Sequence, residues 1–400
     1  MSLFGPMPRR RPNTRQAVSP VLPALPLALL LALASPRAAR ADDFLAYKYE
    51  NYEEPGGRVG VQTQGLSASE DLGADMNFGV TLINDAIAGA SPTGAPAPAG
   101  SGQVPLAHLE DHRKSWEADF SRRFRMVNVT LGASESREHD YVSRGWSLST
   151  QTDLNEKNTT LLVGVAGHSD DVETFYDPEH VYVGKQSFNA IIGVTQVLDP
   201  LTFVSVSATW GHETGFLNDQ YKVVAKTVEL IPGSFFALVF AENRPGERDT
   251  GTLLASVNRA FPSAHAALEA SYRFYADTFG ITANTVELKW IQKIGGAVTL
   301  EPGIRLYEQG AANFYYYNLD GTNIIPTRVP DSSGPHYSSD YRLSSLYGTT
   351  YGIKATWKIH DHLQLDVAFN RYDMRGRDGV TPGSAYPSAN ITSVGARVTW

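Results

Sequence analysis

Long segments in which apolar and polar side chains alternate at every position constrain the fold of this sequence most. Between Leu346 and Ile359, aromatic and aliphatic residues recur at every second position except at Thr349, and residues 264–277 and 363–370 repeat the pattern. A period of two residues is that of a β-strand. These runs exceed the roughly five or six residues of an ordinary strand, and aromatic residues lie near their ends, as at Tyr347 and Trp357. Both features are typical of strands that cross a membrane.

The spacing of the runs predicts an all-β fold, a transmembrane antiparallel up-and-down β-barrel of about sixteen strands, with fourteen as the alternative. An even number is expected because closure places both termini on one side, the periplasmic side. The expected strands are 44–52, 57–66, 74–84, 112–121, 124–133, 141–152, 158–168, 186–198, 202–213, 249–259, 264–276, 281–293, 299–310, 346–358, 361–373 and 390–400.

Connections of alternating length join these strands, as in barrels with short periplasmic turns and long external loops. Short turns are expected near 121–124, 154–157, 198–201, 260–263, 294–297 and 358–361. Long extracellular loops are expected at 85–111, 168–185, 214–248, 311–345 and 374–389. Within the third loop, Val223–Leu230 and Phe235–Phe240 are expected to form a hairpin above the membrane or one more pair of barrel strands.

The first 41 residues have the composition of a secretory signal peptide. Residues 1–15 carry four arginines and no acid, and a leucine-rich stretch follows at 17–34. We predict cleavage between Ala41 and Asp42, which leaves residues 42–400 as the barrel domain. A transmembrane anchor is the alternative, but the stretch is short and three prolines interrupt it.

The rest of the composition narrows the function classes. The 42 acidic residues all lie after residue 41, against 28 basic ones there, so the mature chain is acidic and nucleic-acid binding is not expected. The chain has no cysteine, which excludes disulfides and thiolate metal sites. No second long apolar stretch follows the signal, which excludes a helical membrane protein.

A barrel of this size encloses a polar lumen, and the alternation predicts which charged side chains line it. The expected lumen residues are Glu269, Arg273, Glu287, Lys289, Arg305, Lys354, Lys358, Asp366 and Arg397. Charges of both signs suit a channel. The alternative is that these residues pair with one another and close the lumen.

The segment N-D-A-I-A-G-A-S-P-T-G at 84–94 raises the question of a catalytic serine. A nucleophile elbow requires G-x-S-x-G before a helix, but here Pro92 follows Ser91 and removes a backbone N–H. A phosphate-binding loop would need a lysine that the segment lacks. We expect instead a structured constriction in which Gly89 and Gly94 adopt positive φ and Asp85 and Ser91 turn inward over the lumen.

Histidines offer two further candidate sites. His108 with His112, and His360 with His362, supply two ligands each, fewer than zinc usually requires. We therefore interpret them as solvated residues and expect no metal or cofactor. His168, His212 and His336 lie near outer strand ends, where a rim hydrolase would place its triad, but no spacing selects one.

Several segments together resemble a bacterial outer-membrane β-barrel family of unknown function. They are D-A-I-A-G-A-S-P-T-G (85–94), D-L-N-E-K-N-T-T-L (153–161), Y-R-F-Y-A-D-T-F-G-I (272–281), Y-E-Q-G-A-A-N-F-Y (307–315) and S-S-D-Y-R-L-S (338–344). The resemblance implies an outer-membrane barrel and no particular reaction, cofactor or ligand.

From these observations we expect a cell-outer-membrane channel or porin-like transporter that external loops partly plug, without enzymatic activity. The alternatives are a structural or partner-binding barrel without solute flux and, third, a rim hydrolase. The expected partners are outer-membrane lipid, lipopolysaccharide and an unidentified small solute. The barrel-assembly machinery is also expected, because the last strand ends on the aromatic Trp400.

Overall fold

The computed structural model describes residues 43–98, 100–174 and 182–400. The expected signal peptide and its cleavage site between Ala41 and Asp42 lie outside the described residues. None of the helices among the described residues is long and apolar enough to span a bilayer.

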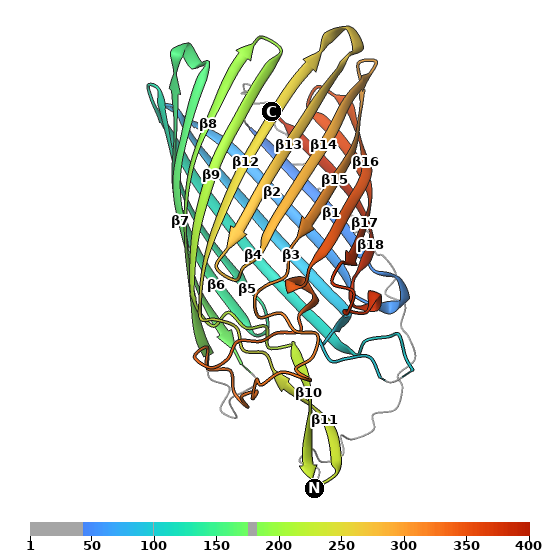
Figure 1. Ribbon diagram of the computed structural model, residues 1–400. Helices are drawn as coiled ribbons and strands as arrows, with labels where there is room; N and C mark the ends of the chain where they lie inside the picture. Colours follow the sequence, from blue (N-terminus) through green and yellow to red (C-terminus); the bar gives the residue numbers. More distant parts are fainter. Residues whose placement is uncertain (1–42, 99, 175–181) are drawn as a thin grey trace.

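Sixteen antiparallel strands close into one barrel (Figure 1), so the predicted fold and strand number are confirmed and fourteen is excluded. The first strand pairs with the last, and Phe44 lies opposite Thr399. The barrel strands are β1 (Phe44–Glu53), β2 (Gly60–Gly73), β3 (Met76–Pro92), β4 (Leu106–Phe124), β5 (Val127–Arg137), β6 (Tyr141–Leu154), β7 (Thr159–Glu173), β8 (Tyr182–Asp199), β9 (Thr202–Gly215), β12 (Glu247–Phe261), β13 (Ala266–Asp277), β14 (Thr282–Ile294), β15 (Val298–Gln309), β16 (Leu346–His360), β17 (Leu363–Gly376) and β18 (Ser388–Thr399).

The remaining two strands, β10 (Val223–Ile231) and β11 (Ser234–Ala241), form a separate hairpin. The expected hairpin is confirmed, and its alternative as an additional pair of wall strands is wrong. Short 3-10 helices occupy some of the connections, at η1 (Pro55–Gly57), η2 (Asn155–Lys157), η3 (Pro262–Ala264), η4 (Tyr341–Leu343) and η5 (Gly383–Ala385).

The two ends of the barrel differ. At one end, which we call the turn end, only short turns join the strands, and β1 begins and β18 ends there. At the other end, the loop end, the long connections gather and the β10–β11 hairpin projects away from the barrel (Figure 1).

Several strands are longer than the sequence indicates. The expected loop at 85–111 is wrong in its bounds, because β3 runs to Pro92 and β4 begins at Leu106. A strand crosses a bilayer in about 9–11 residues, so these strands continue beyond it at the loop end. Their outer-face residues there need not be apolar, and the alternation fades. At the turn end, β2 runs to Gly73 and β4 to Phe124, which moves both turns a few residues toward the C-terminus.

The outer face carries an apolar band with aromatic residues near both edges, as a bilayer requires. On β6, β8 and β9, the rings of Trp146, Phe188 and Trp210 lie in sequence, with centroid distances of 6.5 and 6.2 Å. Nearer the turn end, Phe261 stacks on Trp290 at 5.6 Å.

The spacing of aromatic residues along β16 gives the height of this band. Tyr347 and Trp357 are both exposed on the outer face. Their separation along the strand is about 33 Å at about 3.3 Å per residue. With the strand tilt of about 40° usual in such barrels, this is about 25 Å of height, the thickness of the apolar band of an outer-membrane barrel.

Candidate functional site

A cavity of about 1050 Å³ lies along the inner wall formed by β12–β18 and β1. Most of the charged residues predicted for the lumen line it, namely Glu269, Glu287, Lys289, Arg305, Lys354 and Asp366. The alternation of the sequence therefore places these side chains together in the structure. That they act on a solute stays a prediction.

Charges of opposite sign meet across neighbouring strands of this wall. Lys289 on β14 bonds Glu269 on β13 at 3.0 Å, and the two residues lie opposite each other in the register. The same arrangement joins Arg305 to Glu287 at 2.9 Å. In both pairs the side chains remain about half exposed. The charges thus pair along the wall while a cavity remains beside them.

The other predicted lumen residues lie outside this cavity. Arg273 donates to Thr285 at 3.4 Å on the inner face. Lys358 pairs with Asp361 at 2.8 Å in the turn after β16. Arg397 lines a second hollow of about 460 Å³ at the turn end.

Three charged lining residues were missed by sequence reasoning. Glu301 pairs with Lys354 at 3.0 Å, and Lys48 pairs with Glu50 at 3.1 Å on β1. All three line the cavity. The alternation of inward and outward side chains along β1 and β15 places these three residues on the lumen face and would have identified them.

The long connections fold together at the loop end into a compact layer, which we call the lid. It comprises 93–98, 100–105, 216–246, 310–345 and 377–387. Three buried apolar clusters lie in and beneath it. In one of them, the ring of Phe279 from the β13–β14 turn meets Phe314 edge-on at 4.9 Å. In another, Tyr337 and Leu319 of the lid pack against Val224 of the hairpin, all with 0% exposure. Such packing stabilises a defined loop structure.

A buried network of charges joins the segments of the lid. Arg244 lies between two carboxylates, with its ion-pair contacts at 2.7 Å to Glu242 and 2.9 Å to Asp340. Both carboxylate side chains are buried, at 0% and 1% exposure. Arg342 pairs with Asp340 at 2.5 Å and also with Asp219. Buried charges are tolerated only when they are paired, so this network holds segments 216–246 and 310–345 in one arrangement.

Burial and pairing shift the pKa values of the two carboxyls in opposite directions. Burial raises the pKa of Glu242 to about 7, although Arg244 opposes the shift. Burial also disfavours the charged form of Asp340, but Arg342 and Arg244 outweigh it and hold the pKa below its usual range. Glu242 is therefore the group of this network that titrates near neutral pH.

Asp85 and Ser91 lie on β3, in the barrel wall, and not on a loop over the lumen. Asp85 is 3% exposed, and Arg113 of the neighbouring strand donates to it at 2.6 Å. Ser91 accepts a hydrogen bond at 3.2 Å from Lys222 of the lid, whose amino group also donates to the carbonyl of Pro92 at 2.6 Å. The expected loop is wrong because β3 and β4 continue pairing above the bilayer; a role of either residue in a constriction stays a prediction.

The glycines of the same segment are closely approached by other segments, Gly94 by the hairpin of the lid and Gly89 by the β1–β2 connection. Gly89 and Gly94 have φ of 137° and 92°, so the expected positive φ is confirmed. A Cβ at Gly94 would lie 2.5 Å from the carbonyl oxygen of Val223. A Cβ at Gly89 would lie 2.1 Å from the carbonyl oxygen of Arg58. Only glycine permits both the backbone conformation and the close approach.

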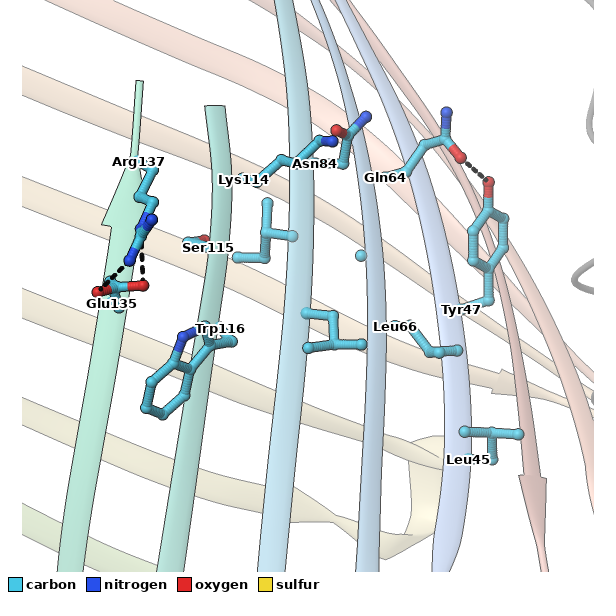
Figure 2. Close-up of a pocket in the computed structure, with 13 residues that line it drawn as sticks. Leu45, Tyr47, Gln64, Leu66, Asn84, Lys114, Ser115, Trp116, Glu135 and Arg137 are labelled. Atoms are coloured by element: carbon cyan, nitrogen blue, oxygen red, sulfur yellow. Dashed lines mark hydrogen bonds and ion pairs between the residues drawn. The ribbon is translucent and has the colours of Figure 1, made fainter. Parts of the chain in front are cut away.

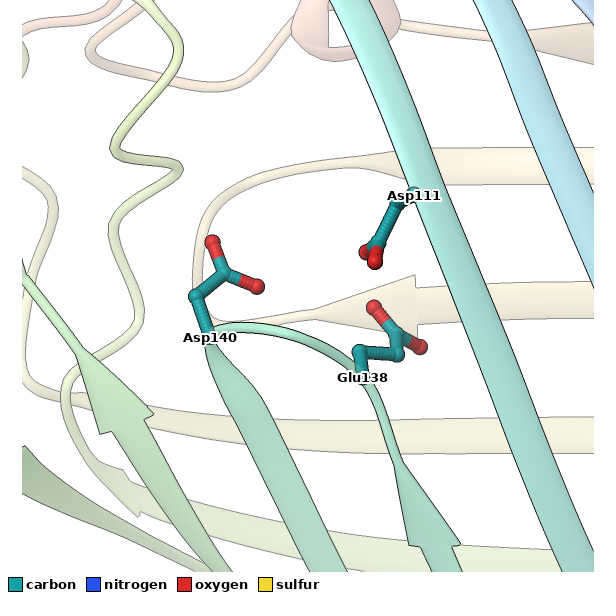
Figure 3. Close-up of side chains that lie close together, drawn as sticks. All are labelled: Asp111, Glu138 and Asp140. Carbon is teal, nitrogen blue, oxygen red and sulfur yellow. The ribbon is translucent and has the colours of Figure 1, made fainter.

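Three carboxylates gather where β4 meets the β5–β6 connection (Figure 3). One oxygen of each of Asp111, Glu138 and Asp140 lies within 4.8 Å of the others. Burial, followed by the charge of Asp111, raises the pKa of Glu138. Asp140 accepts from Gln220 at 2.6 Å and from Tyr221 at 2.5 Å. This group therefore fastens the lid segment 216–222 to the barrel rim.

Among the residues that the structure describes, no three histidines gather into one site. His108 lies exposed on the outer face of β4 with Glu110 at 3.9 Å. The rings of His360 and His362 stack at 5.7 Å beside the turn after β16. His212 contacts Asp249 at 2.9 Å.

Most of the segments that carry the family resemblance converge on the loop end. Segment 272–281 supplies Phe279, segment 307–315 supplies Phe314, and segment 338–344 supplies Asp340. Segment 85–94 contains Ser91, which accepts a hydrogen bond from Lys222 of the lid. The exception is 153–161, which forms a tight turn at the opposite end. These segments of the chain thus lie mainly in the lid and in the surface on which it rests.

Comparisons with known proteins identify a family and no function. A family model described as "Protein of unknown function (DUF3570)" matches residues 22–107 and 99–389. No protein of curated function matches the chain.

Among solved structures, the chain is similar at low identity to two receptors and to CdiB. A mutant of the ferric enterobactin receptor PfeA from Pseudomonas aeruginosa matches with a TM-score of 0.45 and 11% identity, over 90% of this chain and 60% of the receptor. The siderophore receptor PirA from Pseudomonas aeruginosa matches with 0.42 and 11%, over 90% and 63%. CdiB from Acinetobacter baumannii matches with 0.49 and 7%, over 91% and 61%. The chain thus spans less than two thirds of the length of each of these proteins.

Proposed function

The chain belongs to the DUF3570 family of proteins of unknown function, and we propose that it is an outer-membrane channel or porin-like transporter with a lid. The proposal starts from its fold, a closed sixteen-stranded barrel. The observation that carries the proposal is a folded lid, held by a buried ion network, at the end of a barrel whose inner wall is charged and exposed.

The lid is built so that it can open without breaking the barrel. Its polar ties to the rim are local side-chain and backbone contacts, such as the bond from Lys222 to the Pro92 carbonyl and the contacts of Asp140. The strands below are held by continuous backbone ladders that do not involve the lid. The cavity beneath presents charges of both signs, which fits small polar or ionic solutes.

The loop end is proposed to face outward and the turn end the periplasm, with an N-terminal signal removed on export. Trp400 lies at the turn end, where it packs against the cluster of Leu45, Ala396 and Val398. It is proposed to take part in recognition by the barrel-assembly machinery. Long loops outside and short turns inside are the usual arrangement of such barrels.

Planar-bilayer recordings test the proposal. In the test variant, a Ser-Gly linker replaces residues 217–245, which is feasible because the Gly215 amide already bonds the Gly246 carbonyl at 2.9 Å. The shortened barrel should show larger and more frequent discrete current steps than the native chain. The control variant lacks only the hairpin tip, residues 230–235, and keeps the charges of the lid. Silent bilayers with a shortened barrel that is folded, judged by its heat-modifiable migration on gels, would exclude a channel.

A second candidate is a partner-binding barrel without flux, and the hairpin favours it. The tip of β10–β11 exposes Leu230, Ile231 and Phe235 at 60, 61 and 67%. Exposed apolar side chains on a projecting element are typical of interaction surfaces. This candidate predicts no current from either variant and loss of partner binding when residues 230–235 are removed.

One contact in the structure supports the rim-hydrolase hypothesis, but the oxyanion donor that it also needs is missing beside Ser91. Lys222 lies 3.2 Å from the Ser91 hydroxyl, and burial lowers the pKa of this lysine. A serine–lysine pair also needs oxyanion donors, and the residue after Ser91 is a proline without an N–H. The contact is better explained as a tether of the lid. Esterase activity that is abolished by Ser91→Ala would reverse this interpretation.

A further inference from the structure

The outer face of the barrel contains a hollow of about 640 Å³ that runs across β1 to β5 (Figure 2). The side chains of Leu82 and Trp116, which line it, point away from the lumen, since both belong to the exposed apolar band. The hollow therefore opens toward the bilayer. Its lining residues are Leu45, Tyr47, Gln64, Gly65, Leu66, Leu82, Ile83, Asn84, Lys114, Ser115, Trp116, Glu135 and Arg137.

The strand register divides the lining into two walls. One row of facing residues is Tyr47, Leu66, Leu82 and Trp116, which is predominantly apolar. The next row toward the loop end is Gln64, Asn84, Lys114 and Arg137, which is polar. An amphipathic aromatic residue next to a polar row is the signature of the boundary between hydrocarbon and head groups. The hollow therefore lies at this boundary.

The polar wall carries excess positive charge. Arg137 donates to Glu135 at 2.8 and 3.1 Å. Arg144 contacts the same carboxylate at 3.3 Å and Asp171 at 3.2 Å. Lys114 forms no ion pair with any residue in the described parts of the chain. The two arginines thus share two carboxylates, while Lys114 has neither as a partner, and an anionic group beside Lys114 would balance its charge.

These features fit one kind of occupant, an amphiphile with a phosphate at its head and acyl chains at its tail. The apolar wall offers Leu66, Leu82 and Trp116 to an acyl chain. The polar wall offers Lys114 and Arg137 to a phosphate, and Asn84 and Gln64 to hydroxyl or amide groups of the head. If the loop end faces outward, as proposed above, the lipid that reaches this boundary is the acylated, phosphorylated glycolipid of the outer leaflet.

We propose that the hollow across β1–β5 is a binding site for the lipid A part of lipopolysaccharide, with a phosphate on Lys114 and Arg137 and an acyl chain along Leu66, Leu82 and Trp116. The proposal concerns the outside of the barrel. It depends on the orientation of the barrel and does not depend on solute flux through the lumen.

Binding of defined lipids to the purified full-length barrel in detergent tests the site. Titration of hexa-acylated, bisphosphorylated lipid A is followed by native mass spectrometry. The double variant Lys114→Gln, Arg137→Gln should bind lipid A about tenfold more weakly. The matched control is Arg371→Gln, an outer-face arginine on β17 that pairs with Asp373 at 3.0 Å. It should bind as the native chain does, and heat-modifiable migration verifies that each variant is folded.

Binding of other lipids, and co-purification of lipid A from cells, distinguish lipid A from other amphiphiles as the occupant of the hollow. Dephosphorylated lipid A should bind the native chain about as weakly as lipid A binds the double variant. Equal binding of the dephosphorylated form, of phosphatidylglycerol, or of lipid A to the double variant would each overturn the proposal. Lipid A should also co-purify with the native chain from cells; binding in vitro without such co-purification would place the loop end in the periplasm and overturn it as well. Absence of conductance would refute the channel and leave these results unaffected.

Discussion

Replacing Arg244 by methionine should open the lid while the barrel wall stays folded. Arg244 is the shared partner of Glu242 and Asp340, which are almost fully buried. Removing one partner of a buried ion pair costs about 3–5 kcal/mol. Asp340 keeps Arg342 as a partner, so we take the lower figure. At about 1.4 kcal/mol per tenfold change, a cost of about 3 kcal/mol shifts the ratio of open to closed lids by about a hundredfold.

Hydrogen exchange of the purified protein, followed by mass spectrometry, measures this shift. Peptides that cover 338–344 should exchange about a hundredfold faster in Arg244→Met, whereas peptides from β16 and β17 should be unchanged. The matched control is Arg123→Met, which removes an exposed pair with Asp153 at the turn end and should leave lid exchange as it was. Unchanged exchange in 338–344, or equal acceleration throughout the barrel, would refute the interpretation of the network as the lock of the lid.

Further predictions concern pH, packing and selectivity. The pKa of Glu242 is raised to about 7 by burial, above the ordinary value of about 4.3. The contribution of Glu242 to the stability of the closed lid is therefore complete below about pH 4 and is lost as pH rises through 7. The protection factors of the lid amides, which correct for the intrinsic pH dependence of exchange, should fall between pH 5 and 8 and stay level in Glu242→Gln. Gly94→Val should loosen the lid by about 1–3 kcal/mol, seen as faster proteolysis at the loop end, because its Cβ would meet the Val223 carbonyl at 2.5 Å; native resistance would contradict this. Glu269→Gln with Glu301→Gln frees two lumen lysines and should shift reversal potentials in a salt gradient toward anion preference; an unchanged potential counts against a conducting lumen.

The wall strands were predictable because the side chains of a membrane-crossing strand match the medium that each face meets. Each wall strand has lipid on one face and the lumen on the other, so side chains such as Trp357 and Lys354 alternate and reveal the register. The β10–β11 hairpin lies outside the wall, and the sequence left open whether these two segments form a hairpin or two more wall strands. Above the bilayer this constraint disappears. The outer face of β4 there carries His108, Glu110 and His112, and this polar pattern does not indicate that pairing with β3 continues.

The lid was beyond prediction because its contacts join residues that are far apart in the chain. Ser91 meets Lys222 at a separation of 131 residues. Arg244 meets Asp340 at a separation of 96. No local pattern encodes such a pair. The glycines at 89 and 94 did signal an unusual backbone, but the segments that approach them become visible only in the structure.

Cysteine accessibility tests most directly whether the lid closes a lumen. The native chain has no cysteine, so single cysteines report cleanly. In proteoliposomes, an impermeant maleimide labels Ser333→Cys on the lid only in barrels with the loop end outward. It labels the exposed Ser263→Cys only in those with the turn end outward. Ser271→Cys lines the cavity.

We predict that the labelled fraction of Ser271→Cys equals that of Ser263→Cys, because the closed lid blocks entry from the loop end. Adding Arg244→Met should raise that fraction to the sum of the two reporters. Rapid labelling of Ser271→Cys from both ends of the otherwise native barrel would contradict the account.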